Sequence, residues 1–431
     1  MMEALKGRWQ ETRTMKVLEE IMARILLFTG KGGVGKTTVA AATAVCAARH
    51  GYKTVVMSTD AAHSLGDSLD RQLGPEPLPI STNLWAQESN VLYNIEKHWG
   101  TAKKWLAALM AWRGVDEIVA EEIAVLPGIE ELANLLCVYS YEQQGNYDVI
   151  VVDCAPTGES LRLLTFPEVM QWWINKLLPV GRRLVPVTFP VIHRFTDMPL
   201  PDEEIFSTID ELFQQLQGLR SLLTDPRVTT IRLVMNPEKM VIKEAQRTYT
   251  YLNLYGYPTD AVICNRLIPQ DADGSYWEKW KESQTDYLHF IEERFSPLPI
   301  LRVPLLKNEV VGTEALEEIG RHLYAENDPT RILFEGKTVS IDREDGGYVL
   351  SMPLPFVTKG DVSLMRNGDE LVATIGNQRH SILLPQLLLG RELKGAKLDT
   401  GRLYIRFESD KGTNEVIGTK RKSVDKARKL G

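Results

Sequence analysis

A glycine-rich stretch with two lysines, residues 26–38 (LLFTGKGGVGKTT), has the composition of a phosphate-binding loop. Glycines let the backbone fold around phosphate oxygens with its N–H groups pointing inward, and a following helix adds a favourable dipole. Lys36 would neutralise the β- and γ-phosphates of ATP, and Thr37 would offer its hydroxyl to Mg²⁺. Gly30, Gly35, Lys36 and Thr37 all stand in the register of the motif, so a chance glycine-rich turn explains the stretch poorly.

Two aspartates follow strand-like segments downstream. Residues 147–153 (YDVIVVD) form a hydrophobic strand pattern that ends in Asp153, which would hold Mg²⁺ through water or, alternatively, cap the next turn. Asp60 follows the short strand predicted at residues 53–58. It could orient the water that attacks a γ-phosphate, but an N-cap role explains its position equally well.

Two asparagines close further predicted strands. Residues 231–238 and 259–266 are apolar runs that reach Asn236 and Asn265. An asparagine amide both donates and accepts, which suits recognition of an adenine edge, although asparagine is equally common in turns.

The segments that position these residues alternate between strand and helix patterns. Residues 24–28 form a strand pattern before the loop, and residues 39–45 favour a helix after it. Further helices are predicted at residues 99–144, 205–223, 242–255 and 313–326, and a last strand at residues 300–306. We therefore predict an α/β fold, a P-loop NTPase with a mostly parallel sheet and a helical layer.

The predicted domain order is a leader segment (residues 1–23), a P-loop domain (24–330), a small all-β sandwich (333–408) and a polar basic tail (409–431). Glycine-containing hairpin turns between short alternating runs indicate the sandwich. Two insertions in the P-loop domain, at about residues 95–145 and 165–223, are rich in tryptophan and aliphatic residues. They could bind an apolar client or form a buried helical layer, and the pattern leaves both open.

Composition narrows the class of protein. The 431 residues carry a net charge of −7, which gives no support to nucleic-acid binding. Four scattered cysteines, Cys46, Cys137, Cys154 and Cys264, argue against a disulfide framework or a zinc site. The first 23 residues lack the apolar core of a secretory signal, and no apolar run would cross a bilayer. A soluble cytoplasmic protein is expected, or a protein of the plastid stroma if the source is a plant.

Several motifs together carry a family resemblance. The phosphate loop resembles the deviant Walker A of dimeric ATPases, and the chain from Arg24 to about Glu326 resembles the arsenite-pump ATPase family, including its relatives that target tail-anchored membrane proteins. The motifs are KGGVGKTT (31–38), STDAAHSL (58–65), PGIEE (127–131), DCAPTGESLR (153–162) and VPLL (303–306). Residues 381–385, 395–398 and 401–407 resemble the α-crystallin sandwich of small heat-shock proteins.

The resemblance implies roles for individual residues. Lys31 would cross to the nucleotide of a partner subunit, Asp60 would position the attacking water, and Ser64 would lie at a neighbouring contact across the dimer. The phosphate cradle would comprise Gly30, Lys31, Gly32, Gly33, Val34, Gly35, Lys36, Thr37 and Thr38. Asn265, Pro304 and Leu305 would form the adenine cradle, Asn236 and Glu238 would contact nucleotide, and Thr37, Asp60 and Asp153 would surround Mg²⁺.

The first functional hypothesis is a homodimeric ATPase that couples nucleotide state to a hydrophobic protein client, in membrane-protein targeting and with a transient membrane receptor. The C-x-x-C pair of the tail-anchored branch and the separated cysteines of the pump branch are not recognisable in this sequence. The first alternative is an ATP-regulated holdase chaperone that uses the sandwich. The second alternative is a metalloid-stimulated transport ATPase subunit, which the missing cysteine set disfavours.

Overall fold

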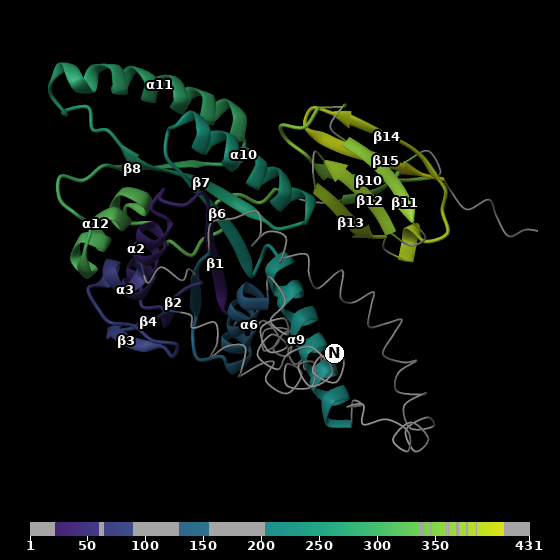
Figure 1. Cartoon of the computed structure of the whole chain (residues 1–431), viewed down its shortest axis with the longest axis horizontal. Coiled ribbons are helices and arrows are strands. Elements are labelled where there is room, and N and C mark those ends of the chain that lie inside the picture. Colours follow the sequence, from purple (N-terminus) through teal and green to yellow (C-terminus); the bar gives the residue numbers. More distant parts are fainter. Residues whose placement is uncertain are drawn as a thin grey trace, which may run out of the picture.

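The computed structural model describes residues 22–59, 64–88, 129–154, 203–336, 340–344, 347–358, 360, 362–367, 370–375, 378–384 and 386–408. Within these residues the chain forms a large mixed sheet with helices on both faces, followed by a smaller all-β unit (Figure 1). No helix among them is both long enough and apolar enough to cross a lipid bilayer.

The large sheet contains eight described strands, all parallel to their neighbours except β3, which pairs antiparallel with β4. Valine, isoleucine and leucine dominate the central strands because both faces of a parallel sheet are buried. In spatial order the strands are β3 (Leu78–Ser81), β4 (Leu84–Glu88), β2 (Thr54–Ser58), β5 (Val149–Asp153), β1 (Arg24–Thr29), β6 (Thr229–Met235), β7 (Thr259–Leu267) and β8 (Ile300–Pro304).

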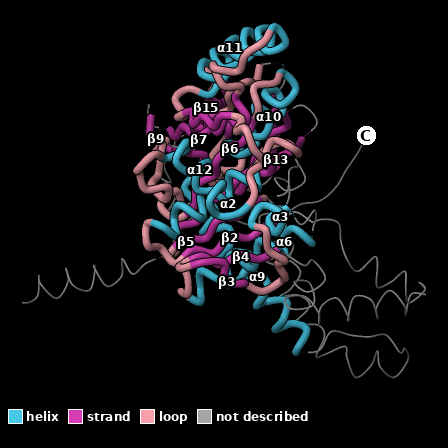
Figure 2. The backbone as a smooth tube through the Cα atoms, turned by 90° about the vertical axis from the view of Figure 1, so that its left-hand side faces the viewer, coloured by secondary structure: helices cyan, strands magenta, loops and turns pink. Residues whose placement is uncertain are grey.

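Helices cover both faces of this sheet (Figure 2). The alanine-rich helix α2 (Lys36–Arg49) packs on β1 and β5, and α3 (Ser64–Leu69) and α12 (Gly312–Tyr324) pack against it. A Cβ at Gly320 of α12 would lie 2.0 Å from the Cys46 sulfur, so the two helices approach closely at that point. The other described helices are α6 (Ile129–Gln144), α9 (Glu203–Thr224), α10 (Lys239–Leu254) and α11 (Ser275–Phe295).

The all-β unit consists of two described sheets, β14-β15-β10-β9 and β11-β12-β13, with an apolar core between them that includes Leu350, Leu371 and Ile405. Its strands are β9 (Ser340–Glu344), β10 (Gly347–Pro353), β11 (Val362–Asn367), β12 (Glu370–Ile375), β13 (Gln378–Leu383), β14 (Leu393–Asp399) and β15 (Arg402–Phe407), with a short 3-10 helix, η2 (Gln386–Leu388). This antiparallel architecture confirms the predicted sandwich, and the parallel sheet with its helical layer confirms the predicted α/β class.

Four described elements of the large sheet and its helices were not predicted from the sequence. These are β3, β4, the short helix α3 and the long helix α11, which buries only Gln284, Ile291 and Phe295 of its side chains. The predicted helix at residues 99–144 is described from Ile129 onward, and its earlier part lies outside the described residues, as does the apolar segment at residues 165–202.

A buried ionic network attaches the segment after α12 to the sheet. Arg232 of β6 and Asp260 of β7 are fully buried, with 3.4 Å between the Arg232 Nε and an Asp260 carboxylate oxygen. The Arg232 guanidinium also donates to the Tyr324 hydroxyl and to the carbonyl oxygens of Pro329 and Arg331. Burial works against its charge, but Tyr324 and Asp260 outweigh this effect and hold its pKa above the usual value.

Arg24 of β1 supports the same segment from the neighbouring strand. Its Nε donates to the Thr330 carbonyl at 2.8 Å, and the backbone N–H of Leu333 donates to Asp260 at 3.2 Å. Burial lowers the pKa of Arg24 to about 10, and the carboxylate of Asp260 opposes this shift. Residues 329–333, which precede the sandwich, are therefore held by charged groups from three strands.

We expect Arg232→Met to lower the free energy of unfolding by about 3–5 kcal/mol, because it leaves the buried Asp260 carboxylate without its main partner. Urea unfolding of the full chain measures this change. Arg227→Met is the matched control, since Arg227 pairs with Asp225 at the surface and is 85% exposed. It should change the free energy of unfolding little, because solvent screens an exposed ion pair, and equal effects of both substitutions would contradict the assigned role of the network.

Candidate active site

The loop between β1 and α2 lies at the carboxyl end of the central strand of the large sheet. Gly30 has φ of +151°, and a Cβ there would lie 2.1 Å from the Val234 carbonyl oxygen of β6. Gly35 has φ of +89°, and a Cβ there would lie 2.3 Å from the Asn265 side-chain nitrogen. Both positions therefore exclude any side chain, and the loop is pressed against the ends of β6 and β7.

Lys36 begins α2 and is 6% exposed. Its ammonium donates to the carbonyl oxygen of Lys31 at 3.4 Å, so the lysine side chain folds back over the loop. The first turn of α2 carries no acidic residue, which leaves the positive end of the helix dipole unopposed. The loop thus combines glycines, a lysine and a helix amino end, and this combination suits a phosphate.

A hydroxyl and a carboxylate meet beside the loop. The Thr37 hydroxyl donates to the Asp153 carboxylate at 2.6 Å, and the Ser58 hydroxyl at the end of β2 donates to the same oxygen at 3.2 Å. Asp153 is 1% exposed. Oxygen ligands of this kind are those that Mg²⁺ prefers, so the donor set fits a magnesium ion next to a bound phosphate.

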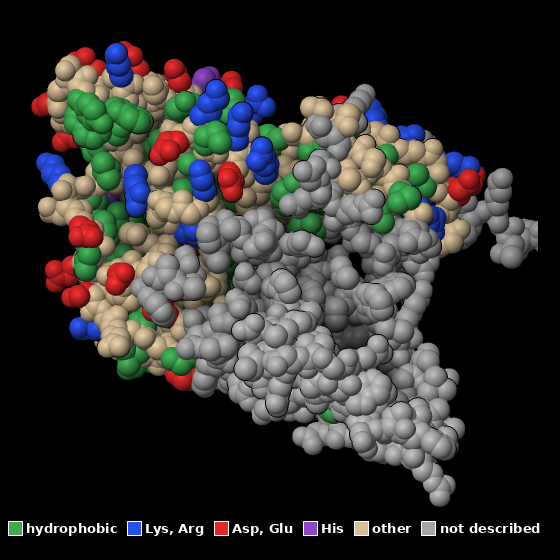
Figure 3. All heavy atoms as spheres, in the orientation of Figure 1, with side chains coloured by type: hydrophobic (Ala, Val, Ile, Leu, Met, Phe, Trp, Pro, Cys, Tyr) green, Lys and Arg blue, Asp and Glu red, His purple; other side chains and the backbone are tan. Residues whose placement is uncertain are grey.

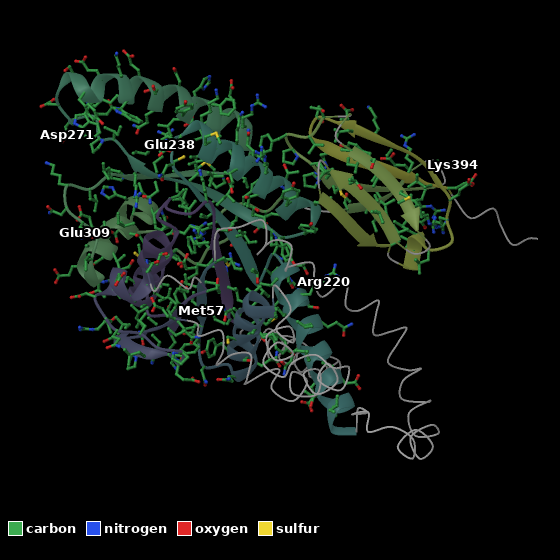
Figure 4. All side chains as sticks on the ribbon, in the orientation of Figure 1. Met57, Arg220, Glu238, Asp271, Glu309 and Lys394 are labelled. Carbon is green, nitrogen blue, oxygen red and sulfur yellow. The ribbon has the colours of Figure 1, made fainter. Side chains whose placement is uncertain are left out.

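Two cavities flank Leu305 and Arg266 beyond the loop. The first, of about 390 Å³, is lined by Thr38 at the start of α2, Asn265 at the end of β7, and Pro304 with the residues after it. The second, of about 320 Å³, is lined by residues that include Asn236, Glu238 and Trp280. Figure 4 shows Glu238 at the start of α10 beneath α11, and Glu309 on the loop before α12.

Asn236 presents a buried acceptor in the second cavity. The side chain is 9% exposed, and within the described part of the chain its Oδ1 has no hydrogen-bond partner. A buried acceptor without a partner costs about 1–3 kcal/mol. A ligand that donates a hydrogen bond in this cavity would recover that cost.

Comparison with known proteins identifies the family. The model of the anion-transporting ATPase family matches residues 23–325. The chain belongs to this family. A second model, described as the HSP20-like domain found in ArsA, matches residues 345–407, so this ATPase also carries an HSP20-like domain.

Several named relatives align with most of the length of this ATPase. It is 41% identical to a protein named "Putative arsenical pump-driving ATPase 1" from Aquifex aeolicus, over 89% of this chain and 99% of the relative. A protein named "Putative arsenical pump-driving ATPase" from Chlorobaculum tepidum is 40% identical, over 90% of this chain and 96% of its own length. The protein named ATPase GET3 from Phaeosphaeria nodorum is 29% identical over 72% of this chain and 97% of its own length.

The structure of this ATPase brings most of the predicted site residues to one edge of the sheet. The residues from Gly30 to Thr38 form the loop and the start of α2, Asp153 lies beside Thr37, and Asn265, Pro304 and Leu305 line one cavity. Asn236 and Glu238 line the neighbouring cavity instead. Ser64 is the first residue of α3, the short helix that packs against α2. Asp60 lies outside the described residues.

Two residues at the end of β7 hold the loop from outside. The Asn265 Nδ2 donates to the Val34 carbonyl at 2.9 Å, and the Arg266 Nη1 donates to the Gly33 carbonyl at 3.0 Å. The Arg266 backbone N–H in turn donates to the Asn265 Oδ1 at 2.9 Å. Arg266 has φ of +58°, a left-handed conformation that is uncommon for an arginine.

The hydrogen bond from Asn265 to Val34 gives this asparagine a second role, beside the recognition of adenine that the sequence suggested. Its amide still has one N–H and one lone pair for a base, because the amide carries two donors and two acceptor sites. With the carbonyl oxygens of Gly33 and Val34 bound on the outer side, the loop is arranged before a phosphate arrives. Arg266 and Ser58 were not predicted as site residues, although each directly adjoins a strand end at this edge.

We expect Arg266→Met to weaken nucleotide binding about three- to tenfold, the worth of one hydrogen bond that prearranges the loop. The Michaelis constant for ATP should rise while the turnover number changes little, because the guanidinium binds the loop and not the reacting phosphate. Steady-state kinetics with Arg266→Lys as the conservative comparison measure this, and Arg266→Lys should recover part of the loss. A fall in turnover alone would contradict a positioning role.

Proposed function

We propose that this ATPase is a homodimer that couples the nucleotide state to the binding and release of a hydrophobic protein client. The observation that carries the proposal is the second lysine of the loop, Lys31, whose carbonyl oxygen accepts a hydrogen bond from Lys36 beside the Thr37–Asp153 pair. One chain needs a single lysine for its own β- and γ-phosphates. An additional lysine at the rim suits the nucleotide of a second copy.

Mg²⁺ fits the proposed site, where Thr37 and Asp153 would hold it with Asp60 nearby. Magnesium, when bound, neutralises charge on the β- and γ-phosphate oxygens. The Thr37 hydroxyl and the Asp153 carboxylate are already joined by a 2.6 Å hydrogen bond, so both oxygens face one point beside the loop. Lys36 would bind the phosphates of its own subunit, and Asp60 would orient the attacking water.

The remaining parts of the proposal concern the base and the client. Asn265, Pro304 and Leu305 line the cavity next to Thr38, which supports an adenine site there. Asn236 and Glu238, in the neighbouring cavity, would contact the nucleotide, in one arrangement that of the partner subunit. The insertions at about residues 95–145 and 165–223 would bind the client.

The likeness to the protein named ATPase GET3 supports a targeting role for the proposed machine. A membrane protein would be the client, and a transient membrane receptor would accept it. The cytoplasm is the proposed setting, or the plastid stroma in a plant. The described parts of the insertions include α9, whose apolar residues Leu212, Leu216 and Leu219 are buried, so this helix would contact a client through its exposed side.

Mixed dimers test the role of Lys31. We expect Lys31→Ala to lower the turnover of ATP about a thousandfold or more, as loss of a basic residue supplied in trans does in related phosphoryl transfer. Lys36→Ala should be inactive because its own loop cannot bind the phosphates. A mixture of the two variants should regain activity, since in the mixed dimer one intact loop meets one intact Lys31.

We would measure the hydrolysis rate and the mass of the assembly for each variant and for the mixture. These values show whether Lys31 acts on the nucleotide of the partner subunit. Unchanged hydrolysis by Lys31→Ala would remove the dimer mechanism. Activity that never returns on mixing would place Lys31 in its own subunit.

The HSP20-like domain supports a second candidate function, an ATP-regulated holdase chaperone. In that case the full chain should suppress aggregation of an unfolded test protein without added nucleotide, and Lys36→Ala should do so just as well under that condition. Loss of suppression in Lys36→Ala would favour nucleotide-coupled client binding.

The names of the Aquifex and Chlorobaculum relatives support a third candidate, a metalloid-stimulated ATPase. Here arsenite should raise the rate of ATP hydrolysis at least severalfold. A rate that does not respond to arsenite would exclude this candidate.

A further inference from the structure

The sandwich is joined to the ATPase domain by aromatic side chains. Tyr249 of α10, Phe295 at the end of α11 and Phe356 of the sandwich form a triangle, with ring centroids 5.8, 6.2 and 5.5 Å apart. The Thr250 hydroxyl donates to the Pro355 carbonyl at 2.7 Å. Leu254, the last residue of α10, is 3% exposed and belongs to the apolar core of the sandwich. We call these six residues the joint.

Phe356 reaches the joint from an unusual backbone conformation. Its φ is +69°, a left-handed conformation that is rare for a bulky residue and strained unless the surroundings compensate. The loop that carries it is bound within the sandwich, because the Leu354 N–H donates to the Gly401 carbonyl at 2.7 Å. The sandwich thus presents one aromatic side chain to the ends of two helices.

The same two helices, α10 and α11, also line the second cavity, with residues nearer their amino ends than the joint. Helix α10 begins directly after Asn236, Pro237 and Glu238, and its first residue, Lys239, lines that cavity. Trp280 and Gln284, in the first half of α11, line it too. Figure 1 shows both helices extending from this region to the sandwich. A contact at the joint and a ligand in the cavity therefore act on the same pair of helices.

We propose that docking of the sandwich at the joint prearranges the nucleotide pocket, so that the HSP20-like domain regulates nucleotide affinity. The joint fixes the far ends of α10 and α11, which set the positions of Asn236, Glu238 and Trp280 in the cavity wall. Without it, the nucleotide must itself order the wall, and part of the binding free energy is lost. Coupling is reciprocal, so nucleotide also strengthens the joint by the same factor.

This inference rests on the proposed function in one respect, that Asn236 and Glu238 contact the nucleotide. Two aromatic side chains on the first half of α11 are exposed, Tyr276 at 69% and Trp280 at 50%, and Figure 3 shows an apolar patch on this helix beside charged side chains. A nucleotide that contacts Trp280 at the rim of the cavity would change the surroundings of this half-exposed indole.

The experiment compares full-length wild type with Phe356→Ala, using a fluorescent ADP analogue and Mg²⁺. Phe356→Ala should weaken binding about fivefold or more, the lower range for coupling between sites. Thr250→Val, which removes the hydrogen bond to Pro355 at nearly constant volume, should weaken binding in the same direction. Met365→Ala is the matched control, since Met365 lies on β11 of the same sandwich and is 59% exposed.

Hydrogen exchange gives the reciprocal measurement. In wild type, ADP should slow exchange of the backbone N–H groups at residues 249–256 and 354–358, and in Phe356→Ala this effect should be lost. Met365→Ala should retain it.

The outcomes separate the inference from the function on which it rests. Wild-type affinity in both Phe356→Ala and Thr250→Val would overturn the coupling, even if hydrolysis and client binding proceed as proposed. Failure of client capture with a fivefold effect of Phe356→Ala would overturn the client proposal and leave the coupling intact. If Phe356→Ala alone unfolds, Thr250→Val decides, and its wild-type affinity would overturn the coupling.

Discussion

The arrangement of the active site depends on two places where backbone packs too closely for any side chain. Gly30 lies against the carbonyl oxygen of Val234, and Gly35 against the amide of Asn265. These contacts join a loop near the start of the chain to strands β6 and β7, about two hundred residues later. A larger residue at either glycine would push the loop away from both strands, and Thr37 would then no longer meet Asp153.

Because of this packing, the loop takes its shape from its neighbours as well as from its own residues. Asn265 and Arg266 bind its outer carbonyl oxygens, and the parallel register of β1, β5 and β2 brings Asp153 and Ser58 to its side. The ion pair of Arg232 and Asp260 lies on the same two strands, β6 and β7. Strands β6 and β7 therefore support three parts of the structure: the phosphate loop, the linker of residues 329–333 after α12, and helix α10.

Sequence patterns predicted the elements whose signals are local. The phosphate loop, the strand ending in Asp153 and the hairpins of the sandwich have short, continuous signatures, and the structure contains the predicted α/β and all-β folds. Helix α11 was missed because few of its side chains are buried, so its apolar period is weak. The role of Arg266 could not be predicted, since its contact with Gly33 joins residues 233 positions apart. Burial and such distant contacts arise from the tertiary fold alone.

The linker after α12 has a further consequence for the sandwich. Residues 329–333 are bound to the sheet through Arg232, Arg24 and Asp260. The sandwich that follows them, with Phe356, is therefore kept near α10 and α11 even when the aromatic contact is broken. This attachment gives the joint a high effective concentration, because its two sides belong to one chain and stay close together. The aromatic contacts of the joint, each weak by itself, can then stay formed in the absence of nucleotide. A modest change in free energy would still be enough to break them. Such a contact is well matched to the scale of free energy that a nucleotide can supply, whereas a large permanent interface would not respond to it.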